Sequence, residues 1–401
     1  NKHTGPNVPA LRFPEFSGEW ECVPLSTYAK KITEKNKGNK IKNVLCNSAT
    51  QGIVPQSEYF DREIANNENT DGYYVVRNQD FVYNPRKSVS APYGPVNIYS
   101  GEDDGIISPL YLCMKIRGID KNYLLHYFKS PAWYPYIYQN GDSGVRHDRV
   151  SIKDEVFLAM PVSVPNGDEQ RKIAKFLGAI NERIATQSKI IEELTALRSA
   201  LHQGIISTGL EDGSWRMQTL AEVLSERTEL NNEGHAVHSV SVSKGIVNQI
   251  EYLGRSFAAK DTSRYHVAYP GDIIYTKSPT GEFPYGIVKQ SQISIKAALS
   301  PLYGVYVPIS PEIGYIIHNH FLSAKNALNY LHPLIQKGAK NTINITNQRF
   351  LQNSMPLPTN KNAALLYYNA IKTVSDKIIL EEMVMEKFQS QKSFLLKTMF
   401  I

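Results

Sequence analysis

The sequence predicts an α+β fold made of two pseudo-symmetric α/β domains, separated by two long helices that form an antiparallel coiled coil. Three observations lead to this prediction. A proline-free stretch in the middle of the chain repeats apolar residues at heptad spacing, the stretches around it have the texture of short strands and turns, and the first half of the chain recurs in the second half.

The chain begins with a polar, proline-rich segment, which we expect to form an arm against the first domain. Short apolar runs then alternate with turns rich in Tyr, Gly, Asn and Pro, as in a domain of short strands. We expect the following parts in order: an arm (1–17), a first domain (18–166), a first long helix (167–207), a linker with a second domain (208–358) and a second long helix (359–401).

The first long helix is predicted from residues 168–207, which contain no proline and two glycines. Their apolar residues alternate in steps of three and four, which is typical of a coiled-coil seam. At 1.5 Å per residue the helix would be about 55–60 Å long. The predicted seam is Ile173, Leu177, Ile180, Ile184, Gln187, Ile191, Leu194, Arg198, Leu201 and Ile205.

An internal repeat divides the chain into two copies of one unit. SPLY at 108–111 recurs at 300–303, GIV at 52–54 recurs at 245–247, and MP at 160–161 recurs at 355–356. The separation is 192 to 195 residues each time, so chance is a poor explanation. Each copy is a globular domain followed by a long helix.

The second helix repeats the seam of the first, including its polar interruptions, because Glu381 matches Gln187 and Lys392 matches Arg198. A one-sided apolar stripe needs a partner, and the other helix is the nearest one. We predict an antiparallel register that pairs Arg198 with Glu381 and Gln187 with Lys392. It also places Ile191 on Phe388, Leu194 on Met385 and Leu201 on Ile378. The second seam is Tyr367, Ile371, Val374, Ile378, Glu381, Met385, Phe388, Lys392, Leu395 and Met399.

Composition narrows the class of protein. The formal charge of +6 and pI near 8.9 fit either an ordinary surface or one that binds a polyanion. The three widely spaced cysteines fit reduced thiols better than a disulfide framework or a zinc site. Without an apolar signal region or an apolar run of membrane-spanning length, we expect a soluble, cytoplasmic protein.

No catalytic motif is found. The sequence lacks the G-x-G-x-x-G, Walker A and H-E-x-x-H patterns, and no Asn-Pro-Pro-aromatic run of a methyltransferase occurs. The tripeptide His318-Asn319-His320 spells HNH, but the repeat aligns it with a short helix in which His318 matches His126. We therefore expect no enzyme activity, no cofactor and no metal in this chain.

Three pairs of equivalent loops are candidates for DNA contact. Each combines glycine, hydroxyl, amide or cationic side chains, which can approach phosphates or make bidentate contacts to base edges. Any one of these loops alone could be an ordinary surface loop. Their occurrence in both copies with different side chains favours two domains that each recognise a different DNA sequence. The candidates are Ser48, Gln51, Arg86, Lys87, Arg146, His147 and Arg149 in the first copy, and Ser243, Lys244, Lys277, Ser278, Lys337, Lys340, Asn341 and Asn344 in the second.

Four features of the sequence point to one family: NVPALRFPEF before Trp20, LAMPVSVP running into DEQRKIAKFL, the LRSALHQGII segment and the tandem repeat. In these features, which cover nearly the whole chain, the sequence resembles the specificity (S) subunit of Type I restriction–modification systems. The second copy departs from it, since PTNK at 358–361 replaces the Glu-Gln element.

The resemblance implies that each domain is a target recognition domain for one half of a bipartite DNA sequence. It implies that the paired helices act as a ruler and dock two modification (methyltransferase) subunits, which restriction subunits join. S-adenosylmethionine would then belong to the modification subunit, and ATP and Mg to the restriction subunit. Half-sites one turn apart, about 34–36 Å, are within reach of such a helix pair.

Two alternatives remain open: a coiled-coil scaffold whose domains bind protein or carbohydrate, and a self-contained methyltransferase or nuclease. The cations on the outer face of the first helix are candidates for docking a methyltransferase subunit, although a solvated face fits them equally well. These cations are Arg171, Lys172, Arg183 and Lys189.

Overall fold

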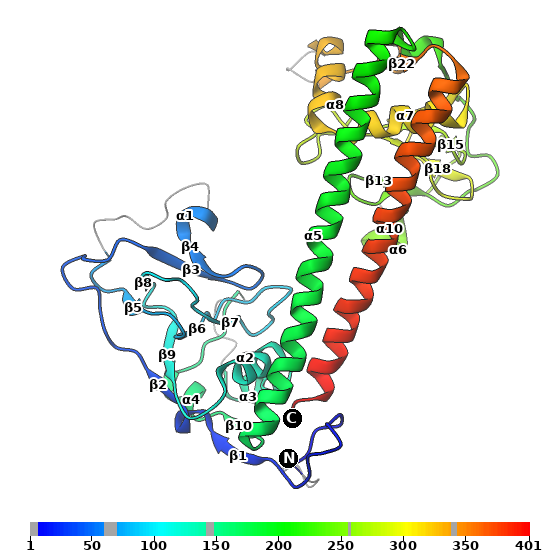
Figure 1. Cartoon of the computed structure of the whole chain (residues 1–401). Helices are drawn as coiled ribbons and strands as arrows, with labels where there is room; N and C mark the ends of the chain where they lie inside the picture. The colour runs from blue at the N-terminus through cyan, green and yellow to red at the C-terminus, as the bar shows by residue number, and fades with distance from the viewer. Residues whose placement is uncertain (1–6, 60–69, 142–147, 256–257, 338–342) are drawn as a thin grey trace. The chain divides into compact units, whose positions relative to one another are not determined.

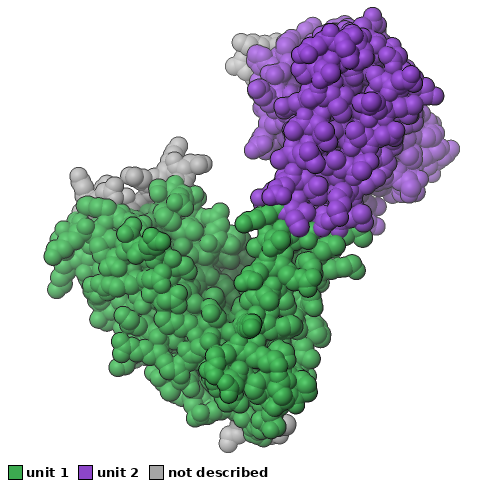
Figure 2. All heavy atoms as spheres, viewed as in Figure 1, with its two compact units in different colours: residues 1–189, 383–401 green, residues 190–382 purple. Residues whose placement is uncertain are grey.

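The computed structural model describes residues 7–59, 70–141, 148–255, 258–337 and 343–401, and it divides into two compact units (Figure 2). Unit 1 comprises Asn1–Lys189 and Met383–Ile401, and unit 2 comprises Ile190–Glu382. Each unit holds one globular domain and a segment of both long helices, α5 (Gly167–Asp212) and α10 (Lys361–Thr398) (Figure 1).

The domain of unit 1 is built from short strands with a few helices packed against them. In order, they are β1 (Glu21–Pro24), η1 (Leu25–Thr27), β2 (Ala29–Lys31), β3 (Val44–Ser48), β4 (Gly52–Pro55), α1 (Gln56–Tyr59), β5 (Tyr74–Val76), β6 (Phe81–Tyr83), β7 (Val96–Ile98), β8 (Gly105–Ile107), β9 (Leu112–Ile116), α2 (Lys121–Lys129), α3 (Tyr134–Asn140), α4 (Asp154–Leu158) and β10 (Pro161–Val164). The strand orders of its sheets are β2-β9-β6-β7, β4-β3-β8-β5 and β1-β10.

The domain of unit 2 repeats this order of elements. They are β11 (Trp215–Thr219), η2 (Leu220–Glu222), β12 (Leu224–Glu226), β13 (His238–Ser241), β14 (Gly245–Asn248), α6 (Gln249–Leu253), β15 (His266–Ala268), β16 (Ile273–Tyr275), β17 (Val288–Gln290), β18 (Ala297–Leu299), β19 (Gly304–Pro308), α7 (Pro311–His320), α8 (Ala324–Leu331), η3 (His332–Leu334), β20 (Gln336–Lys337), β21 (Ile343–Asn344), α9 (Asn347–Phe350) and β22 (Ser354–Pro358). The sheet β12-β19-β16-β17 has the same order as β2-β9-β6-β7. The predicted pair of α/β copies is confirmed.

Both long helices begin at an asparagine cap. The Oδ1 atom of Asn166 accepts a hydrogen bond from the backbone N–H of Glu169 at 2.9 Å, and that of Asn360 accepts one from Ala363 at 3.0 Å. A side-chain oxygen at this position satisfies a backbone donor that has no partner inside the helix. The two helices therefore start in the same way, although the sequences of their junctions differ.

Helix α5 continues five residues beyond the predicted end, so residues 208–212 are helical and not part of a linker. Gly209 does not break the helix. A Cβ atom there would lie 2.1 Å from Cδ1 of Trp215, so the glycine makes room for the indole ring. The helix ends at Gly213, whose φ of 78° suits a left-handed C-terminal position.

All predicted seam residues are buried or half-buried in the structure, from Ile173 to Ile205 in α5 and from Tyr367 to Met399 in α10. The predicted antiparallel coiled coil is confirmed as part of the fold. Its predicted register is wrong.

Contacts within each unit define the true register. In unit 1, the Arg183 guanidinium lies 4.9 Å from the centre of the Phe388 ring, whereas the prediction placed Phe388 on Ile191. In unit 2, Nδ1 of His202 and the Tyr367 hydroxyl are 2.6 Å apart, which again shifts the pairing by about eight to ten residues, or about 12–15 Å along the helix. The pairing of Arg198 with Glu381 and of Gln187 with Lys392 is thereby excluded. Neighbouring registers of a heptad seam bury similar apolar pairs, so the match of charges that selected the predicted register did not identify the true one.

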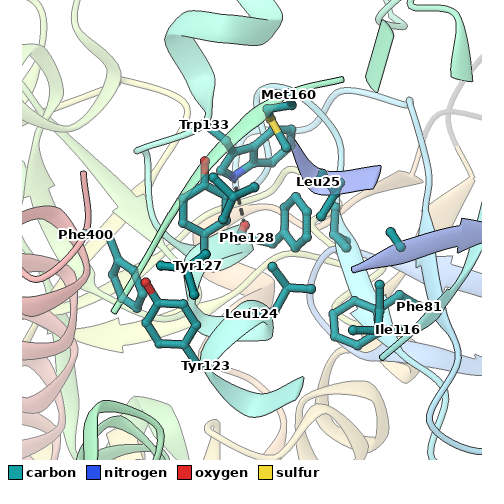
Figure 3. Packing of buried hydrophobic residues seen from close by; sticks show 14 of the residues in the cluster. Leu25, Phe81, Ile116, Tyr123, Leu124, Tyr127, Phe128, Trp133, Met160 and Phe400 are labelled. Atoms are coloured by element: carbon teal, nitrogen blue, oxygen red, sulfur yellow. Dashed lines mark hydrogen bonds between the residues drawn. The ribbon is translucent and has the colours of Figure 1, made fainter. Parts of the chain in front are cut away.

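The core of unit 1 is completed by the end of α10. Phe400 packs against Tyr123 and Tyr127 of α2, with ring centres 5.5 and 6.2 Å apart (Figure 3). In the same core, the Trp133 indole donates a hydrogen bond to the backbone oxygen of Phe128 at 3.1 Å. Other residues of this part of α10 in the cluster are Leu395, Leu396 and Met399.

The core of unit 2 is completed in the corresponding way by the end of α5. Ile206 belongs to the buried cluster, and Leu201 and Ile205 pack against it. The start of α10 contributes Tyr367, which is fully buried and touches Trp215 with ring centres 5.5 Å apart. Each domain thus buries the start of its own helix and the end of the helix from the other copy.

A buried ion pair fixes the N-terminal arm to the start of α5. Arg12 donates two hydrogen bonds to the carboxylate of Glu169, at 2.7 and 2.8 Å, and Glu169 is fully buried. The adjacent Gln170 donates to the backbone oxygen of Pro165 and accepts from the backbone N–H of Asp120. The DEQ segment at 168–170 therefore joins arm, domain and helix, which gives a physical role to the motif behind the family resemblance.

We expect Phe400→Ala to destabilise unit 1 by about 3 kcal/mol, because it removes a buried aromatic side chain from a close-packed core. Phe394→Ala is the matched control on the same helix, since Phe394 is 59% exposed. Hydrogen exchange should speed up in the peptides of unit 1 for the first variant only. Equal effects of the two variants would contradict the packing described.

Candidate nucleic-acid interface

A polar cavity of about 500 Å³ in unit 1 brings together two of the predicted contact loops. Ser48 comes from the end of β3, while Arg86 and Lys87 follow β6. The cavity thus offers hydroxyl, amide and cationic groups on one surface, the mixture that recognises base edges and phosphates. Its other polar lining residues include Asn47, Thr50, Gln56, Tyr73, Asn84 and Tyr111.

A network of buried amides holds the floor of this cavity. Asn47 donates to the backbone oxygen of Val82 at 2.7 Å, and Asn84 donates to the backbone oxygen of Asn47 at 2.9 Å. Asn97 of β7 donates to Asn47 Oδ1 at 2.6 Å and in turn accepts from Nζ of Lys129 at 2.5 Å. Because buried polar groups that are fully paired are rigid, the network positions the loops after β3 and β6. Neither Asn97 nor Lys129 was predicted, because neither belongs to a motif.

The third predicted loop meets the second beside this cavity. Arg149 pairs with Arg86 in an antiparallel bridge, and the backbone N–H of Lys87 donates to the oxygen of Asp148 at 2.8 Å. The Asp148 carboxylate lies within 4.0 Å of both guanidinium groups, so it partly offsets their charge. Gln51 is exposed in the turn between β3 and β4. Arg146 and His147 lie outside the described residues.

In unit 2, Ser243 and Lys244 line a larger cavity of about 730 Å³, beside β17, α7 and the two long helices. The Lys244 ammonium also lies 5.4 Å from the centre of the Tyr252 ring. Lys277 and Ser278 are not among the residues that line this cavity, so the structure does not gather the predicted loops here as it does in unit 1. Burial lowers the pKa of Lys277, partly offset by the carboxylate of Glu226.

The remaining candidates of unit 2 belong to the hairpin of β20 and β21, in which Gln336 pairs with Asn344 and Lys337 with Ile343. Lys340 and Asn341 lie outside the described residues. For Lys337 and Asn344 only the backbone is described.

The HNH tripeptide lies on α7, the helix that the repeat predicts. Nδ1 of His318 accepts a hydrogen bond from the backbone N–H of Gln290 at 3.1 Å. Burial lowers the pKa of His318 and of His320 to about 3, so both rings are neutral. Among the described residues, no group of three or more His, Cys, Asp or Glu side chains could hold a metal ion.

Three of the four cations predicted to dock a partner on α5 interact within unit 1. Arg171 pairs with Asp168, Lys172 pairs with Glu15 of the arm, and Arg183 lies over Phe388. Lys189 is exposed.

An apolar groove on the helices of unit 2 was not predicted. It has a volume of about 840 Å³ and is bordered by Leu197 and Leu366, which are 46% and 62% exposed. Large exposed apolar side chains beside one another are typical of surfaces that bind another protein. The groove is also lined by Ala200, Leu201, Gly204, Ile205, Gly209, Trp215 and Ala363.

No helix in the described part of the chain is long and apolar enough to cross a membrane.

Comparisons with known proteins agree with this architecture. No family model matches the chain. A curated relative from Methanocaldococcus jannaschii, named "Putative type I restriction enzyme MjaX specificity subunit", is 25% identical over 202 residues, which are 46% of this chain and 45% of that protein. The crystal structure of the Type-I restriction-modification system S subunit from M. genitalium covers 98% of this chain and 99% of its own, with 12% identity and a TM-score of 0.57. This chain has the fold of a Type I specificity subunit.

A second solved structure supports the same fold. It is described as the structural basis of complex assembly and conformational transition of the type I R-M system, and it covers 95% of this chain and 97% of its own with a TM-score of 0.51 and 12% identity. The predicted resemblance to Type I specificity subunits is confirmed. The sequence match spans less than half of the length of the curated relative.

We expect the free energy of unfolding of unit 2 to fall less steeply with decreasing pH in His320→Phe than in the unchanged chain. His320 is half-buried, and its buried Nδ1 atom has no hydrogen-bond partner among the described residues. A folded-state pKa of about 3 lies below the usual value of 6.5, so the neutral ring stabilises the fold above pH 6.5 and this contribution is lost as the pH falls.

Urea unfolding at several pH values measures this effect. The advantage of His320→Phe over the unchanged chain should grow by up to about 1.4 kcal/mol per pH unit below 6.5. Stability curves that stay parallel between pH 7 and pH 4 would show that His320 does not titrate on unfolding.

Proposed function

We propose that this chain is the DNA-binding specificity subunit of a Type I restriction–modification complex and recognises a bipartite target. The observation that carries the proposal is the pair of equivalent domains with different polar side chains at matching loops, within a specificity-subunit fold. In unit 1 the loops present Ser48, Arg86 and Lys87 at one cavity, and in unit 2 they present Ser243 and Lys244. Two related surfaces with different donors and acceptors suit two different half-sites.

The proposal assigns sequence reading to this chain and catalysis to its partners. Two modification subunits would carry S-adenosylmethionine, and restriction subunits would use ATP and Mg. The apolar groove beside Leu197 and Leu366 suits the docking of a modification subunit better than the cations of α5, three of which already interact within unit 1. Burial of such side chains is a main source of affinity in protein interfaces.

The function is tested by methylation mapping of DNA modified by the assembled complex. A gapped target sequence is the expected outcome. Failure to enrich any gapped sequence from a pool of random duplexes, with modification subunits present, favours the alternative in which the chain is a scaffold whose domains bind protein or carbohydrate. Methyl transfer by the purified chain alone favours an enzyme.

Arg86→Ala and Lys244→Ala should each affect one half-site. Arg86 is 66% exposed at the cavity of unit 1 and Lys244 is exposed at that of unit 2, so neither substitution disturbs a core. We expect each to weaken binding of the complete target by about 1–3 kcal/mol. Selection of binding sites from randomised half-sites should show relaxed sequence preference in one half for Arg86→Ala and in the other half for Lys244→Ala. Relaxation of the same half by both variants would contradict the assignment.

Leu366→Glu should weaken assembly with modification subunits at least tenfold, because it places a charge in the apolar groove of unit 2. Leu302→Glu is the matched control, since Leu302 is 68% exposed and does not line the groove. Sedimentation or pull-down with purified modification subunit measures the difference. Full assembly of the Leu366→Glu chain would place the docking surface elsewhere.

A further inference from the structure

The cavity of unit 2 is lined by three cationic side chains, Arg198, Lys244 and Lys289, and by the two carboxylates of Glu282 and Glu382. Arg198 of α5, Lys289 of β17 and His318 of α7 all line it, with Ser243 and Lys244 nearby on the lining. Among the ion pairs of the described residues, neither carboxylate is paired with Arg198 or Lys289, although both line the same cavity.

Lys289 is the most unusual of these groups. It is the middle residue of β17, an edge strand of the sheet β12-β19-β16-β17, and is only 5% exposed. Within the described residues, its Nζ has neither a hydrogen-bond acceptor nor a carboxylate partner. Burial, and next the charge of Arg198, lower the pKa of Lys289 to about 8, so the ammonium form still dominates at neutral pH. A buried cation beside a second cation is costly unless an anion compensates it.

His318 adds a neutral hydrogen-bond donor. Because its Nδ1 accepts from the backbone N–H of Gln290, its ring proton is assigned to Nε2. Lys289 and Arg198 both add to the effect of burial in keeping this ring unprotonated. The cavity therefore combines two cationic donors with one neutral donor, and such a set suits a phosphate oxyanion.

At the equivalent place in unit 1, the lysine is hydrogen-bonded within the protein. Asn97 stands at the strand position of Lys289, and Lys392 stands at the helix position of Arg198. There the cation is the half-buried Lys129, and its Nζ donates to Asn97 at 2.5 Å beside the amide network. Unit 1 thus satisfies its lysine with the side chain of Asn97, whereas unit 2 leaves Lys289 facing a cavity.

We propose that the cavity of unit 2 is a phosphate-binding site, in which Arg198 and Lys289 supply the charge and His318 donates a hydrogen bond. The occupant is a phosphate group, either from the backbone of bound DNA or from a free oxyanion. The presence of Ser243 and Lys244 on the lining favours DNA as the source, and this part of the inference rests on the proposed function. The phosphate site itself does not.

Inorganic phosphate tests the site on the full-length chain. We expect phosphate to raise the melting temperature of unit 2 relative to chloride at equal ionic strength. Lys289→Met should weaken phosphate binding at least tenfold while leaving the fold intact, since an apolar side chain of similar length suits the buried position. Arg198→Gln is the second variant, and Lys325→Met is the control, because Lys325 is exposed on α8 outside the cavity.

DNA distinguishes the two sources of phosphate. If a backbone phosphate occupies the site, Lys289→Met and Arg198→Gln should each reduce the slope of log affinity against log salt by about 0.9, and Lys325→Met should not. Loss of the phosphate effect with an unchanged salt slope assigns the site to a free oxyanion. The proposal is overturned if phosphate acts equally on all variants, or if the two variants impair only assembly with modification subunits. A chain that binds phosphate but no DNA would refute the proposed function and keep the site.

Discussion

Neither domain of this protein can complete its hydrophobic core without the helix of the other copy. The end of α10 and the residues after it supply Leu395 and Phe400 to the core of unit 1, and the end of α5 supplies Ile206 to the core of unit 2. Burial of such side chains contributes about 1.5–3 kcal/mol each, a large part of the stability of a domain. Each long helix must therefore be long enough to begin in the core of one domain and to end in the core of the other.

This arrangement also explains the cations in the seam. Arg198 and Lys392 occupy equivalent positions of α5 and α10, and the seam pattern alone made them partners of Glu381 and Gln187 on the facing helix. Each instead interacts with a cation of the domain in its own unit, Arg198 with the buried Lys289 and Lys392 with the half-buried Lys129. The interruptions of the seam mark the places where a helix meets a domain, and there the two copies have diverged in their chemistry.

Periodic features were predictable from the sequence, and features set by single contacts were not. The repeat at 192 to 195 residues and the heptads fixed the two domains and both helices, because each signal is spread over many residues. The register was missed because neighbouring registers of a heptad seam bury similar apolar pairs. The end of α5 was missed because Gly209 resembles a helix stop until Trp215 is seen to pack on it. At the candidate interface, Ser48 and Arg86 were found through their loops, whereas Asn97 and Lys289 carry no motif and depend on burial alone.

The two proposed interactions of the chain depend on different physical forces. The DNA contacts would rest on cations such as Arg86 and Lys244. Their binding to phosphates releases counterions from the DNA, and this release contributes less free energy as the salt concentration rises. The groove beside Leu197 and Leu366 would bind by burying apolar surface, which salt does not screen. A subunit built in this way can stay assembled with its partners while its hold on DNA varies with ionic conditions. The division follows from the fold, because the helices must expose whatever apolar surface the seam and the domain cores leave uncovered, while the loops at strand ends are free to carry charge.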